Sequence, residues 1–322
     1  MNRKRSHYWI WVLSLLAVLI LLIVVGYLIR TADFGRHQRS EEHLQNPAAT
    51  EEPSAEPSAE AETAAPTPAP EEDPAVSEGL ERVQSAFDSF LNSSAGNWSL
   101  YFESLGAHSY SWEASRGIGA EGAVSASVIK LFIMAAVYQE IEAGTIAHDT
   151  AYPLISGMIT VSDNDAANRL VRMLGNGDAA AGMEKVNAYA RSIGCEKTRQ
   201  NRLMLDFNGA ENYVTASDCG RILRLIYDGR CVSKTWSAEM LDVLKAQTVN
   251  NRIPALLPPE AVVAHKTGDL SNLSCGDAAI VFTPYGDYIL CIISNDSPND
   301  AQTITDIANL SAIIYHQFTG TS

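Results

Sequence analysis

The hydrophobic positions begin with one long apolar run near the start of the chain. Residues 8–29 form a 22-residue stretch without a charged side chain, which as a helix would extend about 33 Å, enough to cross the core of a bilayer. Aromatic residues lie near both ends of it, as is typical of membrane interfaces, at Trp9, Trp11 and Tyr27. A cleaved signal peptide is the alternative, although its apolar part is usually shorter and ends in small residues. We expect a cytoplasmic N-terminus at 1–7, an uncleaved single-pass anchor in the cell membrane at 8–29, and an extracytoplasmic remainder.

The next stretch of the chain has almost no large apolar positions. Residues 40–78 contain seven of the 13 prolines, and residues 41–78 hold eleven acidic side chains with no Lys or Arg. Such a composition cannot bury enough apolar surface to offset the entropy of ordering. We therefore expect a disordered acidic linker over residues 30–78. Much of the net charge of −15 lies in this segment, so it says little about a binding partner.

Regular hydrophobic spacing returns from about residue 79. A helical period starts at Leu80, two strand-like runs surround Gly106-Ala107, and the pattern from Ser127 to about Arg230 is mostly helical. Three short apolar runs that read as strands follow, at residues 262–267, 278–283 and 288–295. A last helix places five apolar residues on one face: Ile304, Ile307, Leu310, Ile314 and Phe318.

Strands near both ends of this part, with helices between them, predict an α+β fold of three α/β/α layers. One antiparallel sheet would be flanked by the terminal helices, and an all-helical subdomain would be inserted between its halves. We expect this domain to cover residues 79–322.

The cysteines and basic residues narrow the classes of function. None of the five cysteines pairs at the spacing of a metal site, and they lie at Cys195, Cys219, Cys231, Cys275 and Cys291. We expect buried, inert thiols, with one disulfide left open as an alternative. No metal or cofactor is expected, and no basic patch suggests nucleic acid.

The first candidate for chemistry is the stretch SASVIKLF, which carries Ser127 and Lys130. On a helix these two residues share a face. Backbone N–H groups at a helix start can hold an oxyanion, and a lysine with a lowered pKa can take the serine proton. The alternative is a capped core helix in which Lys130 extends to solvent.

Two further motifs follow in order along the chain. Ser162-Asp163-Asn164 could relay a proton and bind a substrate amide, or it could simply cap the next helix. Lys266-Thr267-Gly268 follows a strand and could lie along a substrate, or it could be a charged edge strand that ends in a turn. Each motif alone is weak evidence for a function.

Together, the three motifs resemble the class A β-lactamase family of penicillin-recognising serine hydrolases over residues 79–322. The resemblance implies that Ser127 is the acylated nucleophile, Lys130 its general base, and Ser162 the proton donor to the leaving nitrogen. It implies an oxyanion hole from the backbone N–H groups of Ser127 and Asp269. The residues it assigns to substrate binding are Asn164, Lys266, Thr267 and Gly268.

The sequence departs from the family where the deacylating water is normally activated. The family has a Glu in a loop about forty residues after Ser-Asp-Asn, and the matching position here is Met204. A thioether cannot take a proton from water at neutral pH. Asp206 lies two residues further on and is the alternative base, but a two-residue shift moves a carboxylate by several ångströms, so we favour a surface or loop-closing residue.

A second departure concerns the carboxylate of the substrate. Most of the family place an arginine nine residues after the Lys of Lys-Thr-Gly, where this chain has Cys275. Some members instead carry an arginine fourteen residues before that lysine, where Arg252 stands here. Arg252 is therefore a candidate clamp for a carboxylate, with a solvated loop charge as the alternative.

These features predict a serine hydrolase that forms an acyl-enzyme with β-lactams and releases it slowly. Two alternatives stay open: a peptidase acting on D-Ala-D-Ala-like ends of peptidoglycan stem peptides, and a β-lactam or peptidoglycan sensor without turnover. The expected partners are a small-molecule substrate and, through residues 8–29, a membrane. The sequence does not determine the oligomeric state.

Overall fold

The structure is a computed structural model that describes residues 74–106 and 109–321. The expected anchor at 8–29 and all but the last five residues of the expected linker lie outside this part. Within the part that is described, no helix combines the length and apolar character needed to cross a membrane.

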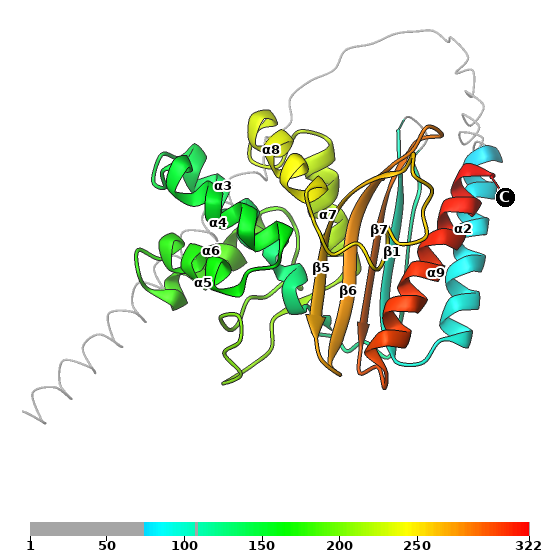
Figure 1. The fold of residues 1–322 in the computed structure, drawn as a ribbon, viewed down its shortest axis with the longest axis horizontal. Coiled ribbons are helices and arrows are strands. Elements are labelled where there is room, and N and C mark those ends of the chain that lie inside the picture. Colours follow the sequence, from blue (N-terminus) through cyan, green and yellow to red (C-terminus); the bar gives the residue numbers. More distant parts are fainter. Residues whose placement is uncertain (1–73, 107–108, 322) are drawn as a thin grey trace, which may run out of the picture. The chain divides into compact units, whose positions relative to one another are not determined.

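A five-stranded antiparallel sheet, in the order β2-β1-β7-β6-β5, forms the centre of the domain (Figure 1). The first two strands come from the predicted hairpin, whose pairing places Phe102 opposite Trp112. The strands of this sheet are β1 (Asn97–Leu105), β2 (Ser111–Arg116), β5 (Val262–Leu270), β6 (Ser274–Phe282) and β7 (Asp287–Asn295). The predicted strands at 262–267 and 278–283 are longer in the structure, because β5 and β6 continue to pair until Leu270 meets Ser274.

Both faces of the sheet are buried, and strand β7 shows this most clearly. Its residues Ile289, Cys291 and Ile293 pack into one apolar cluster, while Tyr288, Leu290 and Ile292 pack into another. Successive side chains of a strand point to opposite faces, so the two clusters lie on opposite sides of the sheet.

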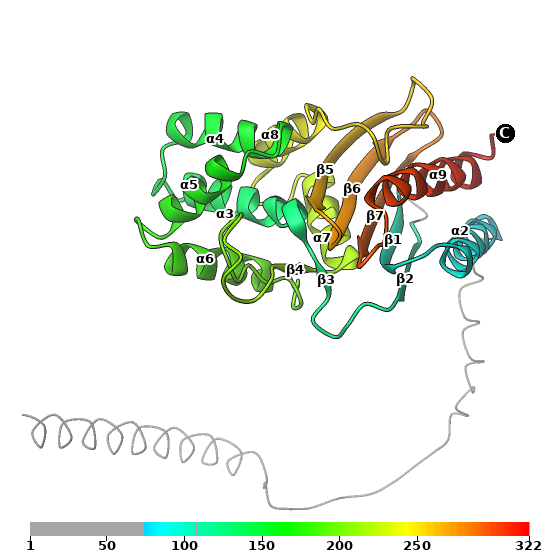
Figure 2. The ribbon, with the colours of Figure 1, turned by 60° about the horizontal axis from the view of Figure 1, so that its bottom comes forward.

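The terminal helices α2 (Pro74–Ser93) and α9 (Asp300–Thr319) lie side by side on one face of the sheet (Figure 2). Val83, Phe87, Leu310 and Ile314 join the cluster on this face, as their helical spacing predicted. Helix α2 begins at Pro74, five residues before the expected start of the domain, since proline is well suited to a first helical turn.

The other face carries the helical part, which is inserted between β2 and β5 as predicted (Figure 1). Ten residues of helix α3 are buried, and nine of them, all but Lys130, belong to the larger apolar cluster. A two-stranded sheet joins β3 (Ala123–Val124) to β4 (Tyr213–Val214). The helices of this part are η2 (Ala126–Ile129, a 3-10 turn), α3 (Lys130–Glu142), α4 (His148–Thr160), α5 (Asn164–Leu174), α6 (Ala179–Ser192), α7 (Ala216–Tyr227) and α8 (Lys234–Lys245).

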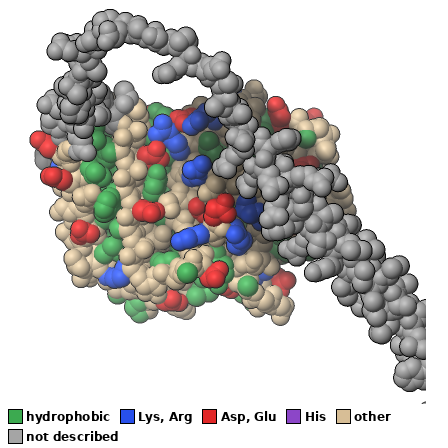
Figure 3. Space-filling model, turned by 180° about the vertical axis from the view of Figure 1, so that it is seen from behind, with side chains coloured by type: hydrophobic (Ala, Val, Ile, Leu, Met, Phe, Trp, Pro, Cys, Tyr) green, Lys and Arg blue, Asp and Glu red, His purple; other side chains and the backbone are tan. Residues whose placement is uncertain are grey.

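Charges of both signs lie close together on the surface. Figure 3 shows Lys and Arg side chains interspersed with Asp and Glu on the face opposite that of Figure 1. Arg224, for example, pairs with both Glu103 at 2.8 Å and Asp228 at 3.0 Å. Such pairs neutralise the local charge.

Candidate active site

Ser127 and Lys130 occupy one turn at the junction between the sheet and the helical part. Ser127 lies in the 3-10 turn η2, and the backbone N–H of Lys130, which begins α3, donates to the Ser127 carbonyl. Residues three apart in a 3-10 turn are eclipsed, so these two side chains share a face more closely than on the expected α-helix. Ala126, just before the serine, has a φ of 44°, an uncommon backbone conformation that tends to occur at functional sites.

The Lys130 side chain is fully buried, which excludes the alternative in which it extends to solvent. Its Nζ donates to the Ser162 carbonyl at 2.7 Å, to the Ser162 hydroxyl at 3.1 Å and to Asn164 Oδ1 at 2.7 Å. Burial lowers the pKa of Lys130 to about 8, although the negative charge of Asp163 opposes the shift. An amine with this pKa is partly neutral near pH 8 and can accept a proton.

Ser162 connects Lys130 to a second buried lysine. Its hydroxyl lies 3.1 Å from Lys266 Nζ, the same distance as from Lys130 Nζ, and Lys266 also donates to the Thr267 carbonyl at 2.7 Å. Burial, followed by the positive charge of Lys130, lowers the pKa of Lys266 to about 7. The Ser162-Asp163-Asn164 motif also caps helix α5, which was the alternative role predicted for it, because the Asp163 carboxylate accepts from two backbone N–H groups. The motif therefore both caps the helix and contacts the two lysines.

Gly268 lets strand β5 approach the serine turn. A Cβ at this position would lie 2.9 Å from the Ser125 carbonyl oxygen and 3.0 Å from the Val128 nitrogen, closer than side chains normally come. Strand β5 is an edge strand, as in the alternative interpretation of Lys266-Thr267-Gly268. Lys266 and Thr267 are nevertheless buried and not solvated. Glycine at this position therefore allows Lys266 to reach the site from the sheet.

Arg252 is not a solvated loop charge, since only 1% of its surface is exposed. Its Nη2 donates to the carboxylate of Asp269, and its Nε lies 3.4 Å from the sulfur of Cys275. Asp269 itself is exposed at the edge of the site. The side chain of Asp269 was not singled out from the sequence, because only the fold brings it to Arg252.

Met204 lies beside Ser127 on a loop between α6 and β4. Both residues line a small cavity of about 40 Å³, together with Asn164, Asp269 and Glu211. Asn168 on α5 holds the loop by its backbone: it donates to the Met204 carbonyl at 3.0 Å and accepts from the Met204 N–H at 2.7 Å. Asn168 could not be singled out from the sequence, since an asparagine on an amphipathic helix has no distinctive signal.

The carboxylates of the same loop are engaged elsewhere. Asp206 is exposed and accepts from the backbone N–H of Asn208 at 3.1 Å and from its side chain at 2.9 Å, contacts that lower the pKa of Asp206. It thus closes the loop, as one reading of the sequence expected. Glu211 lines the cavity but is paired with the buried Arg202 at 2.5 Å. The sequence alone gave no signal for Glu211.

All five cysteines are free and buried. Burial raises the pKa of each thiol, so the reading as inert thiols is confirmed and the alternative of a disulfide is wrong.

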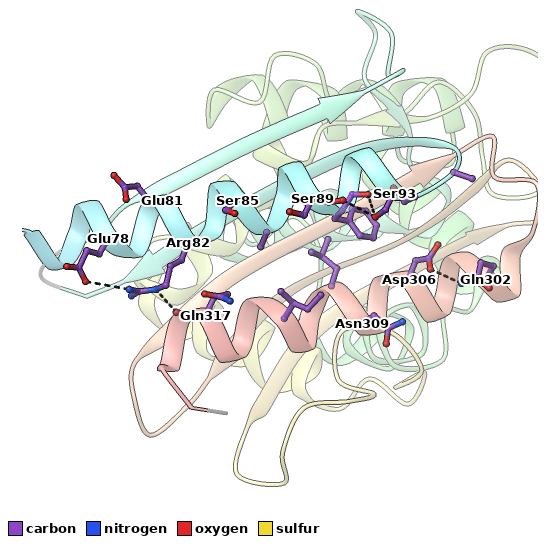
Figure 4. A pocket seen from close by; sticks show the side chains of 16 residues that line it. Glu78, Glu81, Arg82, Ser85, Ser89, Ser93, Gln302, Asp306, Asn309 and Gln317 are labelled. Carbon is purple, nitrogen blue, oxygen red and sulfur yellow. Dashed lines mark hydrogen bonds and ion pairs between the residues drawn. The ribbon is translucent and has the colours of Figure 1, made fainter.

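A wider groove lies between α2 and α9, away from these residues (Figure 4). It has a volume of about 1100 Å³, and Ser85, Ser89 and Ser93 form a row along its α2 side. The charged side chains along it are Glu78, Glu81, Arg82 and Asp306, and Arg82 pairs with Glu78 at 3.7 Å. Among the described residues that line it there is no lysine next to a serine, so volume alone does not identify the reactive site.

The fold and the site together define a class. An antiparallel sheet with terminal helices on one face and a helical part on the other, with Ser127, Lys130, Ser162 and Lys266 at their junction, is the architecture of β-lactamases and related penicillin-recognising proteins. A family model described as "Beta-lactamase enzyme family" matches residues 82–156 and 150–318. The chain therefore belongs to the β-lactamase enzyme family.

Curated relatives support this assignment over part of their length. The chain is 32% identical over 163 residues to Beta-lactamase AST-1 of Nocardia asteroides, covering 48% of this chain and 50% of the relative. It is 28% identical over 177 residues to Beta-lactamase CTX-M-97 of Escherichia coli, covering 52% and 59%. The chain thus spans little more than half the length of these relatives.

Solved structures share the fold. A leucine-to-glutamate mutant of PBP-A, in an acyl-enzyme complex with penicillin G, superposes with a TM-score of 0.65 at 24% identity, covering 74% of this chain and 96% of that chain. The TLA-1 extended-spectrum β-lactamase gives a TM-score of 0.65 at 17% identity, covering 75% and 99%. At this identity the likeness establishes the fold.

Proposed function

We propose that this protein opens β-lactam amide bonds through an acyl-serine intermediate on Ser127 and releases the product slowly. The observation that carries the proposal is the Ser162 hydroxyl, which lies 3.1 Å from each of two buried lysines, Lys130 and Lys266, next to the turn that bears Ser127. Serine attack on an amide needs a base for the serine proton and a proton for the leaving nitrogen. This arrangement supplies groups for both.

During acylation, Ser127, Lys130 and Ser162 would pass one proton from the nucleophile to the leaving nitrogen. Neutral Lys130 Nζ takes the proton of Ser127 as its Oγ bonds to the lactam carbonyl carbon, and backbone N–H groups of Ser127 and Asp269 stabilise the oxyanion. The carbon–nitrogen bond then breaks, and the nitrogen receives the proton of Ser162. The Lys130 ammonium, 3.1 Å away, returns a proton to Ser162. The product is a single adduct, an ester on Ser127 that still carries the amine of the opened ring.

Deacylation requires a water activated beside the ester. The cavity of about 40 Å³ next to Ser127 has room for a water molecule, but the residue that lines it at the position of the family's Glu is Met204. The carboxylates at this cavity, Glu211 and Asp269, are each paired with a buried arginine. Neither of these two carboxylates is free to act as a general base, so the ester persists.

The lack of a general base for the deacylating water also favours a second candidate function. A peptidase that acts on D-Ala-D-Ala-like peptide ends would use Ser127, Lys130 and Ser162 in the same way. Release of D-Ala from a stem-peptide mimic distinguishes this activity from hydrolysis of nitrocefin by a β-lactamase. A sensor without turnover would retain full biological activity after Ser127→Ala.

Intact-mass spectrometry after exposure to benzylpenicillin tests the proposal. We expect an adduct with the mass of the intact drug on the wild type and none on Ser127→Ala. Rapid loss of the drug with no adduct on the wild type would contradict slow release, and an equal adduct on Ser127→Ala would show that another residue is acylated.

A further inference from the structure

Arg252 has one partner at the site, and that partner belongs to the protein itself. The guanidinium is 1% exposed, and its Nη2 donates to the Asp269 carboxylate. Its Nε contacts the Cys275 sulfur at 3.4 Å, which is a weak interaction. Its Nη1 is buried without a hydrogen-bond partner among the described residues. A buried guanidinium normally has a carboxylate or phosphate as its partner, and here Asp269 fills that role.

The Asp269 carboxylate also faces the place where a substrate would lie. Asp269 directly follows Lys266-Thr267-Gly268 on the edge strand β5, and its side chain is 59% exposed. It lines the cavity that also contains Ser127 and Asn164. The Asp269 carboxylate therefore binds the buried Arg252 on a residue that lines the same cavity as Ser127.

We propose that Asp269 determines specificity because its own carboxylate already binds Arg252. The site then selects against substrates with a carboxylate beside the scissile amide and favours substrates that are neutral there. This inference rests on the proposed function, since it concerns which amides reach Ser127. Asp269 would act on the substrate directly, by its charge.

The Asp269–Arg252 ion pair weakens the binding of a substrate carboxylate in two ways. A substrate carboxylate has to displace Asp269 from Arg252 before it gains a bidentate ion pair, which removes most of the benefit of that pair. It also has to approach the negative charge of Asp269, and like charges brought together repel each other. A neutral group at the same place meets neither cost.

No other arginine compensates at the neighbouring strand. Asp269 pairs across the sheet with Cys275, which supplies no positive charge. Lys266 Nζ, the nearest other cation on β5, is already bonded to Ser162 and to the Thr267 carbonyl. Arg202 also lines the cavity, but it is paired with Glu211 at 2.5 Å. Recognition of a carboxylate next to Asp269 would therefore use Arg252, and Asp269 controls access to it.

The test compares benzylpenicillin, which carries a carboxylate, with its neutral methyl ester. The second-order rate constant for acylation of Ser127 is measured for both by intact mass, and the acid-to-ester ratio is the readout. We expect Asp269→Asn to raise this ratio by about tenfold, equivalent to about 1.4 kcal/mol, because it removes the charge and keeps the shape. Asp269→Ser is a second variant that should give the same direction.

Two controls separate a local effect from a change in net charge. Asp242→Asn removes an exposed charge on α8 and should leave the ratio within about twofold, the size of a surface-charge effect. Adding Arg252→Gln to Asp269→Asn should abolish the gain, because the released guanidinium is then absent.

The outcomes separate this inference from the proposed function. Equal ratios in the wild type and in both Asp269 variants overturn the inference while acylation itself stands. Slower release of the adduct by Asp269→Asn, with unchanged acylation, would also overturn it and assign Asp269 to the deacylating water. If neither compound acylates any variant, the proposed function fails and the inference fails with it.

Discussion

Lys130 and Lys266 approach the same hydroxyl, that of Ser162, from two different elements. Neither lysine is exposed, and burial lowers the pKa of each below its usual value. Ser162 has a φ of 59°, so its backbone is held in an uncommon conformation to make these contacts. At the scale of residues, the site is a pair of buried lysines with lowered pKa values that share one serine hydroxyl.

The pH dependence of acylation follows from the lowered pKa of Lys130, about 8. A base is active only when deprotonated, so the acylation rate should rise about tenfold per pH unit below pH 7 and level off above pH 8. The two lysines interact, and the profile reports apparent pKa values of the pair. Stopped-flow or quenched-flow acylation from pH 5.5 to 9.5 measures this.

The matched control for this profile is Lys130→Arg. A guanidinium stays protonated over this range, so the variant should not be acylated at any of these pH values. A flat profile in the wild type, or acylation of Lys130→Arg, would contradict the role of Lys130.

A second buried pair lies next to Lys266. His265 Nδ1 is 2.9 Å from Asp277 Oδ1, and its Nε2 is 3.0 Å from Asn250 Oδ1. Removing the imidazole would leave the fully buried Asp277 without its side-chain partner, although its Oδ2 would keep the Ile253 N–H at 3.2 Å, and we expect His265→Ala to lower the free energy of unfolding by about 3 kcal/mol. Urea unfolding measures the change. The exposed His316→Ala should change it by less than about 0.5 kcal/mol, and a similar small loss at His265 would show that the pair is dispensable.

At the scale of elements, the sequence predicted most of the fold, and a few local features escaped it. Apolar periodicity identified α2, α9 and the three C-terminal strands, since each buries a regular face. It did not reveal that Ser127 lies in a 3-10 turn, nor the Arg252–Asp269 and Arg202–Glu211 pairs. Those features depend on tertiary contacts between distant segments, which leave no periodic pattern.

Gly268 links the strand to the serine turn, and its substitution tests that link. In Gly268→Ala the new Cβ would meet the Ser125 carbonyl at 2.9 Å. We expect a loss of about 1–3 kcal/mol in unfolding free energy, with slower acylation as β5 moves away from η2. Thermal unfolding and the acylation rate give the two readouts. Gly119→Ala, where a Cβ meets nothing within 4 Å, should change neither, and an equally mild Gly268→Ala would contradict the tight approach.

At the scale of the whole molecule, we propose that residues 8–29 anchor the domain to the membrane. The apolar run and its flanking aromatic residues support this, together with the acidic, proline-rich segment that follows. Full-length protein should pellet with membranes and need detergent for release, whereas a chain that begins at residue 31 should stay in the supernatant. Recovery of the full chain in the soluble fraction without cleavage would contradict the anchor.

The central claim is that Ser127 is acylated but, with Met204 where a base is needed, is released slowly. Asn168 holds residue 204 by its backbone, so the side chain can be changed while the loop keeps its support. The direct measurement is a pulse of benzylpenicillin, removal of the drug, and a time course of the acyl adduct by intact mass in wild type, Met204→Glu and Met204→Gln. We expect Met204→Glu to lose the adduct at least about 100-fold faster than the other two, which should match each other, because a placed general base contributes about that factor. Loss of the adduct from the wild type as fast as from Met204→Glu would contradict the account.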